Sequence, residues 1–154
     1  MSLDRSYVDQ NDGERERLRA LVGRLGEDEL RSSVNEDWTV AGVLGHIAFW
    51  DARALVLADK LERGVPFSPS DAEPEDVDWI NDATRPLIHA IAPREAAQLA
   101  LRLAEETDRR VASLAPDRMY PNDAHSPLNA LRADHRAEHL DQIEAALGAD
   151  VERR

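Results

Sequence analysis

The sequence predicts an all-α protein, and two observations carry this prediction. Apolar residues make up 42% of the 154-residue chain but aromatic residues only 5%, and the apolar part is mainly Leu, Ala and Val, as is typical of packed helices. Apolar residues also recur at spacings of three and four over long segments, which is the period of one helix face. Single domains commonly contain roughly 100–150 residues. We therefore predict one helical-bundle domain over residues 1–154.

The first two predicted helices lie on either side of a connector. The first helix runs from about Asp12 to Leu25, and the connector covers residues 26–37. The apolar positions of the first helix follow helical spacing: Leu18, Leu21, Val22 and Leu25. Thr39 offers a side-chain oxygen as the N-cap of the second helix, which ends near Gly64. The wide apolar stripe of the second helix indicates contact with several neighbouring helices.

Prolines divide the middle of the chain. Residues 64–76 hold three prolines and four acidic residues, a composition typical of a loop. Pro86 and Pro93 interrupt the region that follows. Because proline inside a helix removes a hydrogen bond and clashes with the preceding turn, we split this region into two helices. The first is short or kinked and runs from Asp78 to Ile91, and the second starts at Pro93.

The end of the chain predicts one more helix. The helix that starts at Pro93 is expected to end near Leu114, and residues 116–125 are expected to form a loop. Ser126 and Pro127 make a cap and first-turn pair, so they predict the start of the last helix. Gly148 is its expected end.

Two histidines occupy the core-facing stripe of this last helix. The residues at every fourth position are Leu131, His135, His139, Ile143 and Leu147. Side chains four residues apart on a helix have Cβ atoms about 5–6 Å apart, so two imidazoles can converge on one ion. The alternative is a pair of core histidines satisfied by carboxylates such as Asp134 or Glu138. Burying two imidazoles without partners would cost roughly 1–3 kcal/mol each, so we favour a metal-binding pair.

A third ligand must come from elsewhere, and the candidates of the right type are His46, His89, His125 and Asp51. His46 is preferred because it lies in the middle of the most apolar helix, where a lone charged ring would be costly. A single packed core histidine is the alternative interpretation of His46. His89 lies in an interrupted helix and His125 in a Pro-rich loop, so position favours neither as a ligand.

The three tryptophans have different expected places. Trp38 and Trp79 are predicted to anchor the core, as large aromatic residues usually do. Trp50 lies one turn after His46 and is expected to wall the metal pocket.

Composition excludes several classes of function. The chain has no cysteine, so a disulfide framework and a thiolate metal site are both excluded, and any metal binds nitrogen and oxygen. A formal net charge of −12 repels phosphate backbones and anionic lipid. No stretch reaches the ~18 consecutive apolar residues of a membrane span, and the N-terminus lacks the pattern of a secretion signal. We therefore expect a soluble, cytoplasmic protein that acts on a small molecule without a nucleic-acid or membrane partner.

Two segments together resemble the DinB-like superfamily of bacterial metalloproteins, which also includes the thiol-dependent maleylpyruvate isomerases. The segments are residues 37–51, DWTVAGVLGHIAFWD, and residues 135–143, HRAEHLDQI. In that family a Trp-Ser/Thr pair opens the second helix, a histidine follows about two turns later, and the last helix carries HxxxHxxQI. The matching residues are Trp38, Thr39, His46, His135, His139, Gln142 and Ile143. Residues 78–81 are also similar to the opening of the family's third helix.

The chain departs from the family pattern at three positions. Gly42 and Gly45 lie where better helix formers are expected. His135 stands where the isomerase subgroup usually has Glu, which argues against membership of that subgroup.

The resemblance implies an antiparallel four-helix bundle with a long crossover connection and an extra short helix. It also implies a divalent metal ion, often zinc or nickel, held by His46, His135 and His139 with open positions, and frequent assembly into a homodimer. The activity that it implies is transfer of a low-molecular-weight thiol, such as bacillithiol or mycothiol, to an electrophile in detoxification or a stress response. A hydrolase that uses metal-bound hydroxide and a non-catalytic metal-binding bundle are the alternatives.

The imidazoles of a metal site are usually oriented by hydrogen bonds from a second layer of residues. The sequence offers Asp51, Asp134 and Glu138 for this purpose, and it does not distinguish among them.

Overall fold

The computed structural model describes residues 5–66, 77–119 and 128–152, and these parts contain helices and no strand. The helices are α1 (Ser6–Arg24), α2 (Glu27–Arg31), α3 (Val40–Glu62), α4 (Val77–His89), α5 (Pro93–Ser113), α6 (Pro116–Met119) and α7 (Ala133–Glu152). The prediction of an all-α protein is therefore confirmed.

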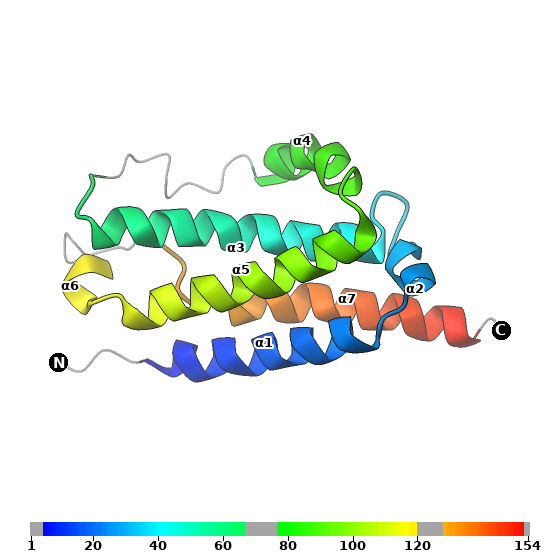
Figure 1. Ribbon diagram of the computed structural model, residues 1–154, viewed down its shortest axis with the longest axis horizontal. Helices are drawn as coiled ribbons and strands as arrows, with labels where there is room; N and C mark the ends of the chain where they lie inside the picture. Colours follow the sequence, from blue (N-terminus) through cyan, green and yellow to red (C-terminus); the bar gives the residue numbers. More distant parts are fainter. Residues whose placement is uncertain (1–4, 67–76, 120–127, 153–154) are drawn as a thin grey trace.

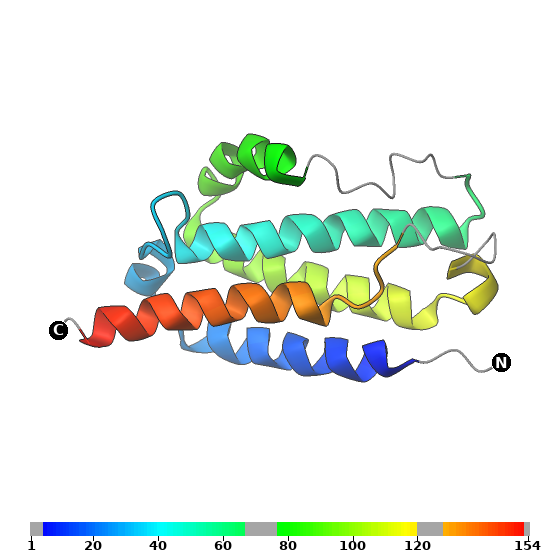
Figure 2. The same cartoon turned by 180° about the vertical axis from the view of Figure 1, so that it is seen from behind.

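Four long helices form the bundle. α3 packs on α5, α5 on α1, α1 on α7 and α7 on α3, so the four enclose a common core. α1 and α7 run in one direction, and α3 and α5 run in the other (Figures 1 and 2). The α1/α5 and α3/α7 neighbours are therefore antiparallel, whereas the long crossover that carries α4 makes α3 and α5 parallel. This is the predicted four-helix bundle with a long crossover connection, but the described residues contain three additional shorter helices, α2, α4 and α6, where one was expected.

α3 is the central helix, and its start is fixed as the sequence predicts. The Thr39 Oγ1 atom accepts a hydrogen bond from the Gly42 backbone N–H at 2.9 Å, which satisfies one of the free donors of the first turn. By length and composition α3 could cross a membrane, but 67% of its most apolar 18-residue stretch is buried inside the bundle. Such burial is expected of the core helix of a soluble protein.

Two glycines let α4 lie directly against α3. A Cβ atom added to Gly45 would lie 2.5 Å from Cγ2 of Ile88, and one added to Gly42 would lie 2.8 Å from Cε1 of His89. Both separations are shorter than atoms tolerate, so a side chain at either position would push α4 away. These are the two positions where the sequence departs from good helix formers, and the close helix contact explains them.

Several predicted boundaries differ from the observed ones. α1 begins at Ser6 rather than Asp12, and the segments predicted as connectors contain the short helices α2 and α6. Trp79, a predicted core anchor, is 71% exposed on α4. Residues 67–76 of the predicted acidic loop lie outside the described residues.

The start of the last helix was predicted wrongly, because its cap comes from another helix. α7 begins at Ala133, not at Ser126 and Pro127, which lie outside the described residues. Asn11 of α1 is buried, and its Oδ1 atom accepts hydrogen bonds from the backbone N–H groups of Arg132 and Ala133 at 2.8 and 2.9 Å. A cap supplied by α1 leaves no local signal in the sequence of α7. The helix also continues past Gly148 to Glu152.

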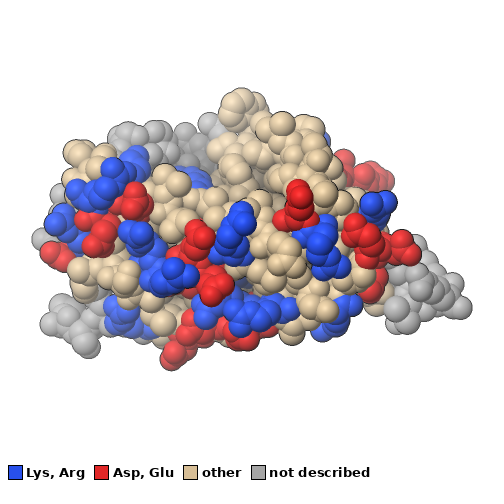
Figure 3. Space-filling view, viewed as in Figure 1, with Lys and Arg blue, Asp and Glu red and all other residues tan. Residues whose placement is uncertain are grey.

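The surface carries charges of both signs. Figure 3 shows Lys and Arg side chains interspersed with Asp and Glu on the face viewed in Figure 1. The net charge of −12 is therefore not gathered into a single patch on this face.

Candidate metal centre

Three histidines from two antiparallel helices meet between α3 and α7. His46 comes from α3, and His135 and His139 come from consecutive turns of α7. The Nε2 atom of His46 lies 3.1 Å from that of His139 and 3.3 Å from that of His135, and the latter two are 3.1 Å apart. The three nitrogen atoms thus form a nearly equilateral triangle.

The spacing of this triangle fits one metal ion. Zinc binds imidazole nitrogen at about 2.0–2.1 Å, so nitrogens on a tetrahedral or octahedral ion are roughly 2.9–3.4 Å apart. The three observed separations all fall in this range.

The hydrogen-bonding chemistry of the triangle also favours a cation. In a neutral imidazole each ring nitrogen is either a donor or an acceptor. Among three mutually adjacent nitrogens, at least two must both be donors or both be acceptors, so at least one of the three contacts is repulsive in the absence of a cation. A single ion that accepts three lone pairs removes this conflict, and His46, His135 and His139 therefore fit a divalent metal.

Burial keeps two of these rings neutral, which is the form that binds a metal. Desolvation lowers the pKa of His46 from 6.5 to about 4, and the neighbouring His139 adds to this effect. Desolvation is also the main cause of the lowered pKa of His135, at about 2, with further contributions from the other two histidines and from Arg132 and Arg136.

Gln142 orients the third ring. Nδ1 of His139 lies 2.8 Å from Oε1 of Gln142, one turn further along α7. An amide oxygen only accepts, so Nδ1 carries the proton and Nε2 presents its lone pair to the triangle. Nδ1 of His46 and of His135 is buried, and no hydrogen bond from the described residues reaches either atom. His139 is thus the ring whose orientation the protein fixes through a hydrogen bond.

Trp38 walls the site. Its ring lies 5.4 Å from that of His46, centroid to centroid, in an edge-on arrangement. The loop before α3 holds it there, because the backbone N–H groups of Val34 and Asn35 both donate to the Trp38 carbonyl oxygen, at 2.8 and 3.3 Å. Trp38 packs against the core as expected, but it is only partly buried and also contributes to the pocket.

Trp50, the predicted wall, lies outside the pocket lining and acts on it indirectly. Its Nε1–H donates to Oδ1 of Asn81 at 2.9 Å, which ties α4 to α3.

His89 lies outside the triangle, and both of its ring nitrogens have protein partners. Nδ1 lies 2.8 Å from the Arg85 carbonyl oxygen, so it must donate. Nε2 then accepts from the Thr39 backbone N–H at 3.3 Å. His89 therefore fastens the end of α4 to the start of α3. His125, the other alternative ligand, lies outside the described residues.

Asp51 belongs to a buried ionic network rather than to the histidines. Its carboxylate accepts from Nε of Arg132 at 2.9 Å and from Nε of Arg136 at 3.1 Å. Arg136 also forms a two-pronged pair with Asp108 of α5, at 2.7 and 2.8 Å, and Arg15 of α1 approaches the same carboxylate at 2.7 Å. Asp51 and Arg136 are fully buried. The expectation that Asp51 orients an imidazole is therefore replaced by this role.

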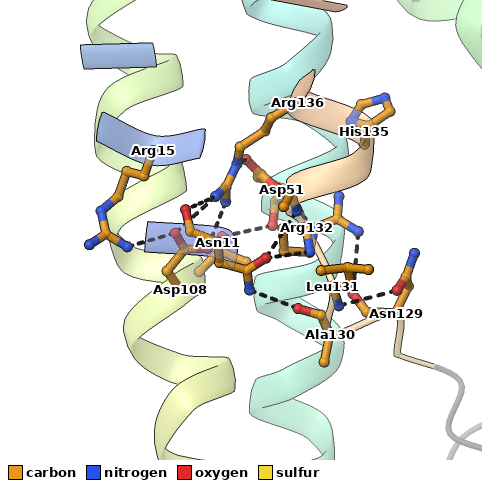
Figure 4. Close-up of polar contacts among 12 residues, drawn as sticks. Asn11, Arg15, Asp51, Asp108, Asn129, Ala130, Leu131, Arg132, His135 and Arg136 are labelled. Atoms are coloured by element: carbon orange, nitrogen blue, oxygen red, sulfur yellow. Dashed lines mark hydrogen bonds and ion pairs between the residues drawn. The ribbon is translucent and has the colours of Figure 1, made fainter. Parts of the chain in front are cut away.

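The network sets the position of the helix that carries two ligands. Arg132 directly precedes α7 and Arg136 lies in its first turn, so the two flank His135 in the sequence, and Figure 4 shows His135 pointing away from them. Their partners are Asp51 on α3, Asp108 on α5 and the Asn11 carbonyl oxygen on α1. Removing one member of a buried ion pair typically costs about 3–5 kcal/mol, so the register of α7 against the other three helices is strongly fixed. Sequence patterns did not reveal this network, although two arginines on the buried side of a helix were a possible signal.

The remaining two candidates for orienting the rings lie at the surface. Asp134 and Glu138 are exposed on α7, and no hydrogen bond from either reaches an imidazole in the part of the chain that the structure describes. Gln142, which belongs to the family motif, takes the role expected of them.

A polar cavity of about 440 Å³ opens onto the triangle through His46 and His139. Its walls come from the loop before α3, from α4 and from α7, and they include Asn35, Asp37, Trp38, Asp78, Asn81, Asp82, Arg85 and Gln142. A small molecule in this cavity would therefore lie next to the triangle.

The fold and the site together define a helical-bundle protein with a candidate divalent-metal centre of three histidines. The family model of the DinB superfamily matches residues 10–143, so the chain belongs to the DinB superfamily. No curated protein and no solved structure matches the chain.

Proposed function

We propose that this protein is a divalent-metal-dependent transferase that conjugates a low-molecular-weight thiol to an electrophilic small molecule. The observation that carries the proposal is the combination of three convergent Nε2 atoms with a 440 Å³ cavity that reaches two of them. Catalytic metal sites differ from structural ones by keeping a position open toward such a space. Bound zinc or nickel would supply Lewis acidity, which lowers the pKa of a thiol and favours the nucleophilic thiolate near neutral pH.

The residues of the chain have separate tasks in this proposal. His46, His135 and His139 hold the ion, and the proton on Nδ1 of His139 is kept in place by Gln142. Trp38 limits access of water to His46. The cavity walls bind the substrates beside the ion, so that both reactants are held close together.

Metal analysis is the first test. Elemental analysis of the purified protein should find about one equivalent of a divalent metal, and His139→Ala should lower this content. His89→Ala is the matched control, because His89 lies outside the triangle and its loss should leave the metal content unchanged. Equal metal content in the wild type and His139→Ala would overturn the proposed site.

An activity screen then tests the reaction. Metal-loaded protein is mixed with cysteamine, cysteine or 2-mercaptoethanol and with monobromobimane, and the formation of thioether is followed by fluorescence. Thiol-dependent turnover that His139→Ala abolishes would support the transferase. Cleavage of a p-nitrophenyl ester without thiol-dependent turnover would favour a hydrolase instead. Loss of stability on metal removal, with neither activity, would favour a non-catalytic bundle.

We further propose, from the family resemblance, that the protein is a cytoplasmic homodimer. Light scattering after size-exclusion chromatography tests the second part, and a monomeric mass at micromolar concentration would contradict it.

A further inference from the structure

Three side-chain amides line the cavity beside the triangle, and the oxygen atom of each one is already used by the protein. They are Asn35 before α3, Asn81 on α4 and Gln142 on α7. Oδ1 of Asn35 accepts the backbone N–H groups of Asp37 and Trp38, at 2.9 and 3.0 Å. Because backbone N–H groups only donate, the oxygen of Asn35 must face them. The NH₂ group of Asn35 is therefore the part left for a ligand.

The same argument applies to the other two amides. Oδ1 of Asn81 accepts from Nε1–H of Trp50 at 2.9 Å, and an indole nitrogen can only donate. Oε1 of Gln142 faces Nδ1 of His139, which carries the proton when Nε2 binds a metal. In the described residues no hydrogen bond uses the NH₂ group of Asn35, Asn81 or Gln142. The cavity therefore has three neutral donor groups whose orientation is set by protein contacts.

The charged groups of the cavity act against anionic ligands. The cavity lining contains the three carboxylates of Asp37, Asp78 and Asp82 and the one guanidinium of Arg85, so its side chains carry a net charge of −2. The guanidinium is also engaged, because its Nη1 atom lies 3.1 Å from Oδ1 of Asp82. The anionic donor atom of a ligand would partly neutralise the charge of a metal ion in the triangle. The rest of the ligand would then lie among the carboxylates of the cavity lining, which repel a second negative charge.

We propose that Asn35, Asn81 and Gln142 bind the uncharged oxygen atoms of the substrate, and that the substrate class is a neutral carbonyl-, hydroxyl- or ether-bearing molecule. The NH₂ groups supply the hydrogen bonds, and the carboxylates exclude carboxylate- and phosphate-bearing competitors. Trp50 is a positioning residue that holds the Asn81 amide in its donating orientation. This inference rests on the proposed function in one respect, which is that the ligand occupies the metal centre.

A pair of matched thiols tests the proposal. 2-Methoxyethanethiol and butane-1-thiol have the same length and charge, but only the first has an ether oxygen, which can accept and cannot donate. Their Kd values are measured on cobalt-loaded protein by visible absorption. Asn81→Asp keeps an oxygen for Trp50 and removes the donor, so the preference for the ether should fall about two- to tenfold, the equivalent of one hydrogen bond. The added charge acts equally on both thiols and cancels in the ratio.

Controls separate this effect from a change in structure. Asn129→Asp makes the same chemical change outside the cavity, where Oδ1 accepts from the Leu131 backbone N–H at 3.2 Å. It should leave the ratio unchanged. Asn35→Asp is the second test at the cavity, and it provides an answer if Asn81→Asp does not fold. Trp50→Phe should weaken the preference while leaving the donor itself present.

A second pair, methoxyacetohydroxamate and butanohydroxamate, binds metals without thiol chemistry and makes failures distinguishable. A reduced ether preference with both pairs supports both proposals. The same reduction with hydroxamates alone, when neither thiol binds, overturns the proposed function and supports the amide donors. Thiol binding with an unchanged ratio in Asn81→Asp and Asn35→Asp overturns the donors and leaves the proposed function standing. Absence of binding by all four probes overturns both.

Discussion

Gly45→Ala tests whether α4 really lies against α3, where it forms one wall of the cavity. The added Cβ atom would lie 2.5 Å from Cγ2 of Ile88, a buried residue of α4. Gly13→Ala is a matched control because Gly13 also lies inside a helix, yet a Cβ atom there would meet nothing within 4 Å. The two changes therefore share their backbone effect and differ only in packing.

The magnitude follows from two opposing effects. Replacing Gly by Ala inside a helix stabilises it by about 1 kcal/mol at either position. At Gly45 an extra methyl group in a filled space should cost about 1–3 kcal/mol, because Ile88 is branched and buried and can move only with α4. Gly13→Ala should therefore raise the free energy of unfolding, whereas Gly45→Ala should be about 1–3 kcal/mol less stable than Gly13→Ala. For a chain of this size each kcal/mol corresponds to about 2–4 °C in Tm.

The assay is thermal and urea unfolding of the two variants beside the wild type, together with cobalt binding. If Gly45→Ala and Gly13→Ala are stabilised equally, then α4 does not pack on α3 as described and the cavity lacks that wall. A loss of stability in Gly45→Ala with normal ether preference in the thiol pair would show that α4 moves without altering the amide donors.

Three further predictions concern the site and its support. In metal-free protein, urea unfolding should show that the free energy of unfolding falls between pH 6.5 and pH 4. Unfolded His46 binds a proton in this window, whereas folded His46, with its pKa of about 4, does not. His46→Gln should lower the slope of the free energy of unfolding against pH by up to about 1.4 kcal/mol per pH unit, and an unchanged slope would contradict a neutral buried ring. Asp108→Asn should lower the free energy of unfolding in urea by about 3–5 kcal/mol, because it leaves the buried Arg136 with one charged partner fewer. The control is Asp12→Asn, at a half-exposed partner of Arg15, which should lower it by less than about 1 kcal/mol. Gln142→Ala should weaken metal binding about 10- to 100-fold in a chelator competition at unchanged Tm, and equal affinity would show that His139 needs no orienting partner.

The sequence predicted those features that depend on local pattern. Helical periodicity predicted the four long helices, and the core-facing stripe of the last helix predicted that His135 and His139 face the core. The place of His46 in the most apolar helix favoured it as the third ligand, and the resemblance supported this choice. The structure places its Nε2 atom within 3.3 Å of the Nε2 atoms of His135 and His139. Metal binding by the three remains a prediction.

Features that depend on contacts between distant segments were not predicted. Asn11 caps α7 from the other end of the chain, so the start of α7 was placed too early. Asp51 was one of three carboxylates that the sequence offered to orient the imidazoles, but the buried Arg132 and Arg136, just before and within α7, bind it instead. A carboxylate takes the partner with the strongest charge-assisted hydrogen bonds, and this partner lies more than eighty residues away.

The cap that Asn11 provides has a consequence for the order in which the protein matures. During synthesis His46 leaves the ribosome long before the last helix exists, and the first turn of that helix is completed only when α1 folds back on it. The contacts that build the centre thus span most of the chain, and such long-range contacts form late in folding. A nascent chain that still lacks α7 has no assembled triangle, so a metal ion bound by the three histidines would be captured only after α1 and α7 have met.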